Sequence, residues 1–332
     1  MNDITIVTAF FDIGRGDWTP EKGLPHYLQR TTDTYLERFG HLAKLENKII
    51  VYTSEDLSSK IKEIRGDLPT EVFVVDFKNN FEQLRKEITD IQKNPEYQAK
   101  INSSQIKNPE YWNADYVLVN LLKSAFVNRA MPFVDTELVA WLDFGYCRDE
   151  TTLGGVRFWE YPFDKEKIHF FNIKDWVEGT FIQDVISNND VHITGPCIVA
   201  GKEMWPTLEH LVHHNVNELL KNQLIDDDQT LMLMSTLLDP NLFELHKLAA
   251  QAEILRRQHL GELLSHDEFS SKMSELPDHN DIPDTKDHEE KSSVYREIID
   301  GAKKIVLHVV HWANCACGEQ FGISFDGGHW VF

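Results

Sequence analysis

The sequence predicts an α/β protein built around a sheet that is parallel in its first half. Strand-like and helix-like segments alternate through residues 4–200, which is typical of this class. The first strand segment is a nearly continuous apolar run, as expected of a strand buried on both faces. The chain has 332 residues, of which 42% are hydrophobic, and this is enough to form a sizeable core.

The predicted strands follow one another with breaks between them. Residues 4–11 (ITIVTAFF) form the first strand, and the glycine-containing stretch DIGRG ends it. Apolar and β-branched runs predict the later strands at 48–53 (KIIVYT), 71–76 (EVFVVD), 137–143, 167–172 (KIHFFN) and 192–200 (HITGPCIVA).

Helices are predicted between and after these strands. One is expected over residues 24–42, and a mostly buried one over 111–130. Residues 205–220 have the spacing of an amphipathic helix. The run TLMLMSTLL, which follows three aspartates at 226–228, predicts a buried helix with acids at its start.

The strand ends indicate where a ligand would bind. In sheets of this kind, ligands lie at the carboxyl ends of the strands. This rule places residues 10–15, 53–56 and 143–148 along one edge, where they could line one pocket.

Composition excludes several classes of function. The formal net charge of −21 argues against a protein that binds the phosphate backbone of nucleic acids. The four cysteines are too few and too irregularly spaced for a disulfide framework, so we expect a reducing, cytoplasmic setting. No apolar window is long enough to span a membrane, and the N-terminus has no signal-peptide pattern.

Asp143 is the first candidate site residue. It ends an apolar strand and is followed by Phe144 and Gly145. One interpretation is an Mg²⁺ or Mn²⁺ ligand, because these ions often take one or two carboxylates and complete their shell with phosphate and water. The other is an aspartate that ends the strand and accepts local N–H groups.

The run Asp226, Asp227, Asp228 and Gln229 is the second candidate. Acids at a helix start interact favourably with the helix dipole and can cap it. A cap needs only one of them, which favours a role as a base or as a partner for a sugar hydroxyl, with Gln229 donating to it.

Cationic and imidazole side chains complete the candidates. Arg15 and Lys123 could neutralise phosphates, although DIGRG is not a dinucleotide fingerprint and its glycines could equally form a turn. Histidines of the C-terminal segment, including His329, could fold over a pocket and complete a metal shell, or they could be packed or exposed.

The chain is predicted to have three parts. Residues 1–261 form the main domain, which contains the predicted strands and helices. Residues 262–293 form a polar, acidic insertion with the composition of an exposed, disordered segment. Residues 294–332 are aromatic-rich and are expected to pack back on the body.

Several motifs together resemble a known family. TIVTAFFDIGRGDW, KIIVYTSED and AWLDFGYCRD, in this order, resemble the HtrL/YibB family of bacterial proteins, which is linked to surface-glycan loci. The segment ITGPCIVAGKEMW followed by LIDDDQTLM is similar to the acceptor half of GT-A glycosyltransferases. The resemblance extends from about residue 5 to residue 246.

The resemblance implies a GT-A-like (Rossmann-like) fold with a central mixed, mostly parallel sheet flanked by helices, and it makes residues 1–261 a nucleotide-sugar and acceptor domain. It places Thr8, Ala9, Phe10 and Arg15 beside the nucleotide. Asp143 would stand where that fold has the metal-binding acid of its D-x-D motif, although Gly145 here replaces the second acid.

The same resemblance implies the activity. It places Asp227 and Asp228 near the acceptor hydroxyl or the donor sugar. The expected reaction is sugar transfer from a UDP-sugar, with Mn²⁺ or Mg²⁺, to a lipopolysaccharide, capsule or related glycan acceptor. Any contact with the inner face of the inner membrane is expected to be transient or mediated by a partner. The alternatives are a nucleotidyl or phosphoryl transferase and a catalytically silent nucleotide-sugar-binding or scaffold protein.

Overall fold

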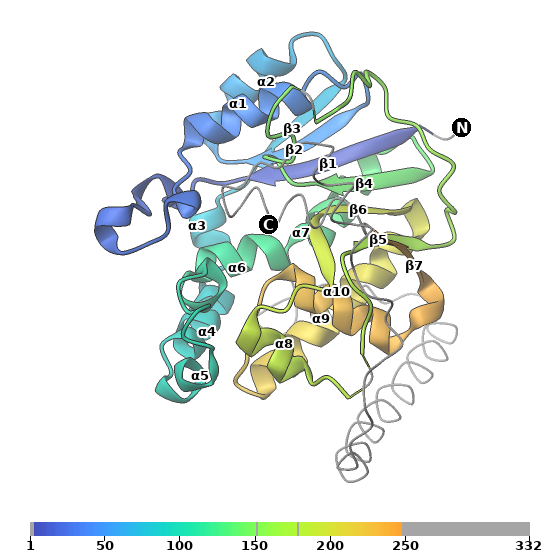
Figure 1. The fold of residues 1–332 in the computed structure, drawn as a ribbon. Helices are drawn as coiled ribbons and strands as arrows, with labels where there is room; N and C mark the ends of the chain where they lie inside the picture. The colour runs from blue at the N-terminus through green and yellow to red at the C-terminus, as the bar shows by residue number, and fades with distance from the viewer. Residues whose placement is uncertain (1–2, 151, 178, 248–332) are drawn as a thin grey trace, which may run out of the picture.

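One seven-stranded sheet forms the centre of the protein in a computed structural model, which describes residues 3–150, 152–177 and 179–247. Its strand order is β3-β2-β1-β4-β6-β5-β7 (Figure 1). The strands are β1 (Ile4–Phe10), β2 (Ile49–Thr53), β3 (Thr70–Val74), β4 (Leu138–Leu142), β5 (Ile168–Asn172), β6 (Ile193–Gly201) and β7 (Phe243–Lys247).

The direction of the strands divides the sheet. β1 to β4 are all parallel to one another in the order β3-β2-β1-β4. β6 runs antiparallel to both β4 and β5, and β7 pairs with β5 in parallel. The predicted fold class, a central mixed and mostly parallel sheet flanked by helices, is therefore confirmed, as is the parallel first half.

Helices cover both faces of the sheet (Figure 1). α1 (Thr32–Leu42) and α2 (Glu55–Arg65) lie on one face. The other face carries the remaining α-helices, which are α3 (Phe77–Asn80), α4 (Glu82–Gln92), α5 (Pro95–Lys100), α6 (Ala114–Leu121), α7 (Lys123–Ala130), α8 (Ile182–Asn188), α9 (Trp205–Lys221) and α10 (Asp228–Leu238).

The apolar run of β1 supplies both cores. Ile4 and Ile6 pack on the face with α1 and α2, whereas Val7 and Ala9 pack on the opposite face. Successive side chains of a strand point to opposite sides, so a strand between two helical layers is mostly apolar on both of its faces.

Two predicted helices differ from the structure. The helix expected over 24–42 begins only at Thr32, because Pro25 is extended and the Thr31 side chain caps the helix by accepting from the N–H of Thr34 at 3.2 Å. The helix expected over 111–130 is two helices, α6 and α7, which meet at Leu122. This break places Lys123 at the start of α7.

The predictions for the C-terminal part cannot be compared with these elements. The insertion at 262–293, the segment at 294–332 and His329 lie outside the described residues.

Candidate functional site

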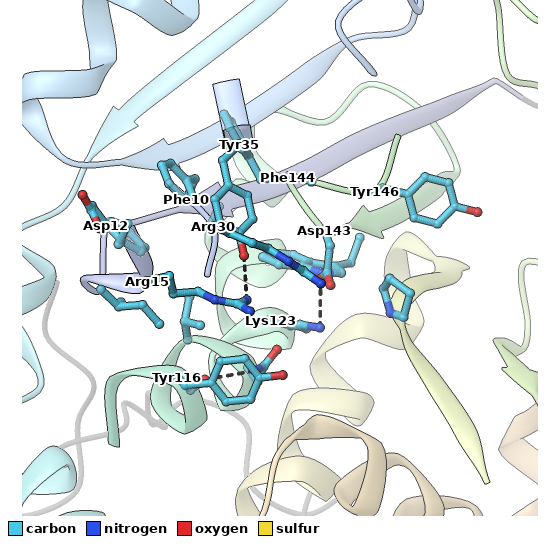
Figure 2. Close-up of a pocket in the computed structure, with 18 of the residues that line it drawn as sticks. Phe10, Asp12, Arg15, Arg30, Tyr35, Tyr116, Lys123, Asp143, Phe144 and Tyr146 are labelled. Carbon is cyan, nitrogen blue, oxygen red and sulfur yellow. Dashed lines mark hydrogen bonds and ion pairs between the residues drawn. The ribbon is translucent and has the colours of Figure 1, made fainter. Parts of the chain in front are cut away.

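A cavity of about 570 Å³ lies at the carboxyl ends of β1 and β4. Ligand pockets are typically of this size. Residues from two of the three predicted edge segments, 10–15 and 143–148, line it, whereas residues 53–56 do not. Its walls include Ala9, Phe10, Arg15, Arg30, Tyr35, Tyr116, Lys123, Trp141, Asp143 and Arg148 (Figure 2).

An ion-paired lysine lies at the base of this site. The Nζ atom of Lys123 lies 2.9 Å from Oδ1 of Asp143 and 2.8 Å from Oδ2 of Asp228. It also donates to the carbonyl oxygen of Gly195 at 3.0 Å. The lysine side chain is only 5% exposed, so these three oxygens satisfy a charge that water does not reach.

Burial and ion pairing act on this lysine in opposite directions. Burial by itself lowers the pKa of Lys123, but the carboxylates of Asp143 and Asp228 outweigh it and hold the pKa above its ordinary value. Burial raises the pKa of Asp228, although the Lys123 ammonium opposes this effect. Lys123 is therefore a permanent positive charge beside the cavity.

The surrounding chain holds this arrangement in place. Asp143 follows β4, and its main-chain N–H donates to the carbonyl of Pro196 at 2.9 Å. The indole of Trp141 donates to Oδ1 of Asp143 at 2.8 Å. Gly195 is required on the β6 side, because a Cβ atom there would lie 2.3 Å from Oδ2 of Asp228.

These contacts make Asp143 a poor ligand for a divalent ion. Its Oδ1 already accepts from Trp141 and Lys123, and the Lys123 ammonium also occupies Asp228, the nearest second carboxylate. A cation bound at Asp143 would face this buried positive charge at short range. Among the described residues, the group whose side chains could hold a metal lies on β5 and β7 and includes neither aspartate.

Three arginines also line the cavity. Arg15, Arg30 and Arg148 all contribute to its wall, and the side chains of Arg15 and Arg30 point toward the space beside Asp143 (Figure 2). Burial lowers the pKa of Arg38, and the charges of Arg30, Arg148 and Arg15 lower it further. Four guanidinium groups thus lie near one another in a chain whose net charge is −21.

Arg15 is held rigidly at this wall. Its Nη1 donates to the hydroxyl of Tyr35 at 2.7 Å, and its Nε and Nη2 donate to the carbonyl of Leu28 at 3.3 and 3.2 Å. The guanidinium carbon lies 5.0 Å from the ring centroid of Trp18 and 5.8 Å from that of Tyr116. Burial lowers the pKa of Arg15.

The acids before α10 have different surroundings. Asp227 caps the helix by accepting from the main-chain N–H of Gln229 at 3.0 Å. Asp226 accepts from the hydroxyl of Thr230 at 2.7 Å. Burial raises the pKa of Asp226 to about 7. Burial and the charge of Asp226 raise the pKa of Glu110 to about 8.

The structure separates the predicted site residues. The main cavity is lined by Ala9, Phe10, Arg15, Lys123 and Asp143, and Asp228 joins them through Lys123. Asp227 and Gln229 instead line a second, small cavity with His192. Thr8 lies fully buried within β1, and its hydroxyl has no hydrogen-bond partner.

Sequence reasoning missed several residues of the cavity. Arg30 precedes α1 in a loop, and Tyr35 and Tyr116 face the cavity from two helices. Only the distances between segments far apart in the chain identify these side chains. Arg148 carried a detectable signal, because it stands five residues after Asp143 on the same predicted edge.

Known proteins are similar to this chain over most of its length. Protein HtrL of Escherichia coli (strain K12) is 43% identical over 249 residues, which are 74% of this chain and 87% of that protein.

Of the helices in the part of the chain that the structure describes, none has both the length and the apolar character needed to cross a membrane.

Two solved structures are weakly similar. Mouse xyloside xylosyltransferase 1 in its apo form has a TM-score of 0.39 and 14% identity, over 73% of this chain and 84% of that chain. The 4-diphosphocytidyl-2C-methyl-D-erythritol synthase of Anaerococcus prevotii has a TM-score of 0.34 and 12% identity, over 79% and 97%. Similarities of this size do not establish a common activity.

The family assignment comes from a match to a family model. This model is described as "Bacterial protein of unknown function (HtrL_YibB)", and it matches residues 2–252. The match covers more than two thirds of the chain and agrees with the identity to the Escherichia coli protein. The chain therefore belongs to the HtrL/YibB family, as its motifs predicted.

Proposed function

We propose that this protein is a glycosyltransferase that moves a sugar from a nucleotide-sugar donor, UDP-linked, to a hydroxyl group of a lipopolysaccharide, capsule or related glycan. One observation carries the proposal. A cavity at the carboxyl edge of the sheet combines arginines and a buried lysine on its walls with the carboxylate of Asp143.

The cationic wall suits a diphosphate. Arg15, Arg30 and Arg148 present guanidinium groups, which bind phosphate oxygens through paired N–H donors. Lys123 adds a positive charge, because its two carboxylate partners keep its ammonium group protonated. Fixed positive charges lower the barrier most when they lie where negative charge develops, which here is the leaving diphosphate.

Asp143 is the proposed proton acceptor. Its side chain is 39% exposed in the cavity, and Trp141 and Lys123 fix its Oδ1. In an inverting transfer, the acceptor oxygen bonds to the anomeric carbon while the bond from that carbon to the phosphate oxygen breaks. The diphosphate leaves with the electron pair, and the acceptor proton goes to Asp143.

Asp228 is a positioning residue in this scheme. It is buried, and it acts through Lys123 rather than by touching the substrate. The Mn²⁺ or Mg²⁺ ion predicted from the sequence has no step in this scheme, because Lys123 already occupies Oδ1 of Asp143.

Calorimetric titration of UDP into the protein tests the proposal, once with EDTA and once with Mn²⁺. We expect binding in EDTA, and we expect Arg148→Ala to weaken it by at least about tenfold, the loss of one charge-assisted contact. Arg157→Ala is the matched control, because the Arg157 side chain is 80% exposed and pairs with Glu46 away from the cavity.

Each outcome is informative. If UDP binds in EDTA, hydrolysis of a panel of UDP-sugars is measured next, and Asp143→Asn is expected to bind UDP but to release no sugar. Binding without turnover of any donor would favour a silent nucleotide-sugar-binding protein. Failure of the wild type to bind UDP under both conditions would refute the uridine donor. Binding of UDP only with Mn²⁺ would instead support the metal-binding role that the sequence predicted for Asp143.

A further inference from the structure

Three side chains with metal-binding chemistry meet at the far edge of the sheet, outside the cavity described above. His169 comes from β5, and Glu244 and His246 come from β7. The two strands are parallel, and their register pairs His169 with Glu244 and Phe171 with His246. Because alternate residues of a strand share a face, all three side chains project from the same face.

The donor atoms lie at distances that suit a small cation. Nδ1 of His169 lies 3.0 Å from Nε2 of His246 and 3.4 Å from Oε2 of Glu244. All three donor atoms lie within 4.8 Å of one another. Tetrahedral zinc with bonds near 2 Å separates its ligand atoms by about 3.3 Å, so only small side-chain movements are needed.

The outer contact of His169 fixes its tautomer. Its Nε2 lies 2.8 Å from the carbonyl oxygen of Asp164, which can only accept, so Nε2 carries the proton. The lone pair of Nδ1 then points toward Glu244 and His246. A histidine that donates its other ring N–H to a main-chain carbonyl is the usual arrangement around a bound metal.

Burial also suits a ligand role. The His169 side chain is 1% exposed and packs against Phe163 with ring centroids 4.7 Å apart, whereas Glu244 is 51% exposed. The site is therefore enclosed on one side and open to solvent at the carboxylate.

We propose that His169, Glu244 and His246 form a Zn²⁺ site with one coordination position left for water. Two imidazoles and one carboxylate match the ligand preference of zinc, and the exposed side of Glu244 provides the entry path. The bound ion would tie edge strand β7 to β5, and it would stabilise the folded protein by an amount that grows with the logarithm of the zinc concentration.

The test is calorimetric titration of Zn²⁺ into chelator-treated full-length protein. We expect Glu244→Gln to weaken one zinc site by at least about tenfold. Glu71→Gln, on the opposite edge strand β3, is the matched control and should bind zinc as the wild type does. His246→Asn is a second variant with the same expected loss.

Cobalt(II) distinguishes this site from others. Histidines on α9 and cysteines elsewhere in the chain could also bind zinc, so the number of sites is compared between variants rather than taken from the wild type alone. The proposed site has no thiolate, so its cobalt spectrum should have visible bands without a thiolate charge-transfer band, and both variants should lose them.

Zinc binding and cobalt spectra that are identical in the wild type, Glu244→Gln and His246→Asn would overturn the proposal. His169 and His246 would then form only a hydrogen-bonded pair that closes the sheet edge. A zinc-dependent rise in unfolding temperature that disappears in Glu244→Gln, but not in Glu71→Gln, would support the proposal independently of any catalytic activity.

Discussion

Gly195 and Asp228 approach so closely that a larger residue at position 195 would have to displace the aspartate. A Cβ atom at position 195 would lie 2.3 Å from Oδ2 of Asp228, and the carbonyl of the same glycine accepts from Lys123 at 3.0 Å. A single residue of β6 thus contacts both the buried lysine and its carboxylate partner, and β6 runs beside β4, which Asp143 follows.

Gly195→Ala should destabilise the protein and disturb the site. The added methyl group must displace the Asp228 carboxylate, and overpacking of this kind costs about 1–3 kcal/mol. Urea unfolding measures the loss, and UDP titration measures the site. Gly40→Ala in α1 is the control, since a Cβ there meets nothing within 4 Å and should be neutral or stabilising. Equal stability of the two variants would contradict the close approach.

Lys123→Met should be strongly destabilising. The substitution leaves the carboxylates of Asp143 and Asp228 without their shared cation, and breaking a buried ion pair from one side costs about 3–5 kcal/mol. The double variant Lys123→Met with Asp228→Asn removes one of the stranded charges and should recover part of the loss. Urea unfolding of both single variants and the double variant measures this coupling, and additive losses would argue against it.

Glu110→Gln should stabilise the protein at pH 8 and have little effect at pH 5. Burial raises the pKa of Glu110 to about 8, well above its value in the unfolded chain, so the folded state keeps a proton that the unfolded state loses. The contribution of this group to stability is therefore present at low pH and is lost as pH rises toward 8.

The amide removes this loss while keeping an oxygen that can accept from Asn189, which donates to Glu110 at 2.7 Å. The wild type should lose up to about 1.4 kcal/mol of unfolding free energy per pH unit between pH 5 and 8 because of this group. The variant should not show this loss. Glu96→Gln, on the exposed side of α5, should leave the slope unchanged. Urea unfolding at several pH values provides the data, and equal slopes in all three proteins would refute the raised pKa.

Arg15→Lys should weaken both folding and nucleotide binding despite the conserved charge. A single ammonium group cannot reproduce the contacts with Tyr35 and the Leu28 carbonyl, and charge-assisted hydrogen bonds of this kind contribute about 1.5–3 kcal/mol. Unfolding and UDP titration are measured side by side. Arg157→Lys at the exposed site is the control, and matching results for the two variants would show that charge alone matters.

Local sequence signals predicted the sheet because a doubly buried strand needs apolar residues throughout. The runs at β1, β2 and β4 identified the parallel half and its order in the chain, and the strand-end rule placed Asp143 and Arg15 on one edge. The motifs also predicted the family that the comparison with known proteins shows. The break at Leu122 was missed, because both halves of that segment are apolar enough to continue as one helix.

By itself, then, the sequence determined the α/β class, the strand ends that carry polar residues, and the family. Only the tertiary structure decided which charges meet: Lys123 lies 105 positions from Asp228 in the chain, yet their side chains pair at 2.8 Å. It also brought His169 beside His246, 77 positions apart. The physical reason is that periodicity records burial along one segment, whereas ion pairs and ligand sets depend on distances between segments, which only the packing of helices on the sheet specifies.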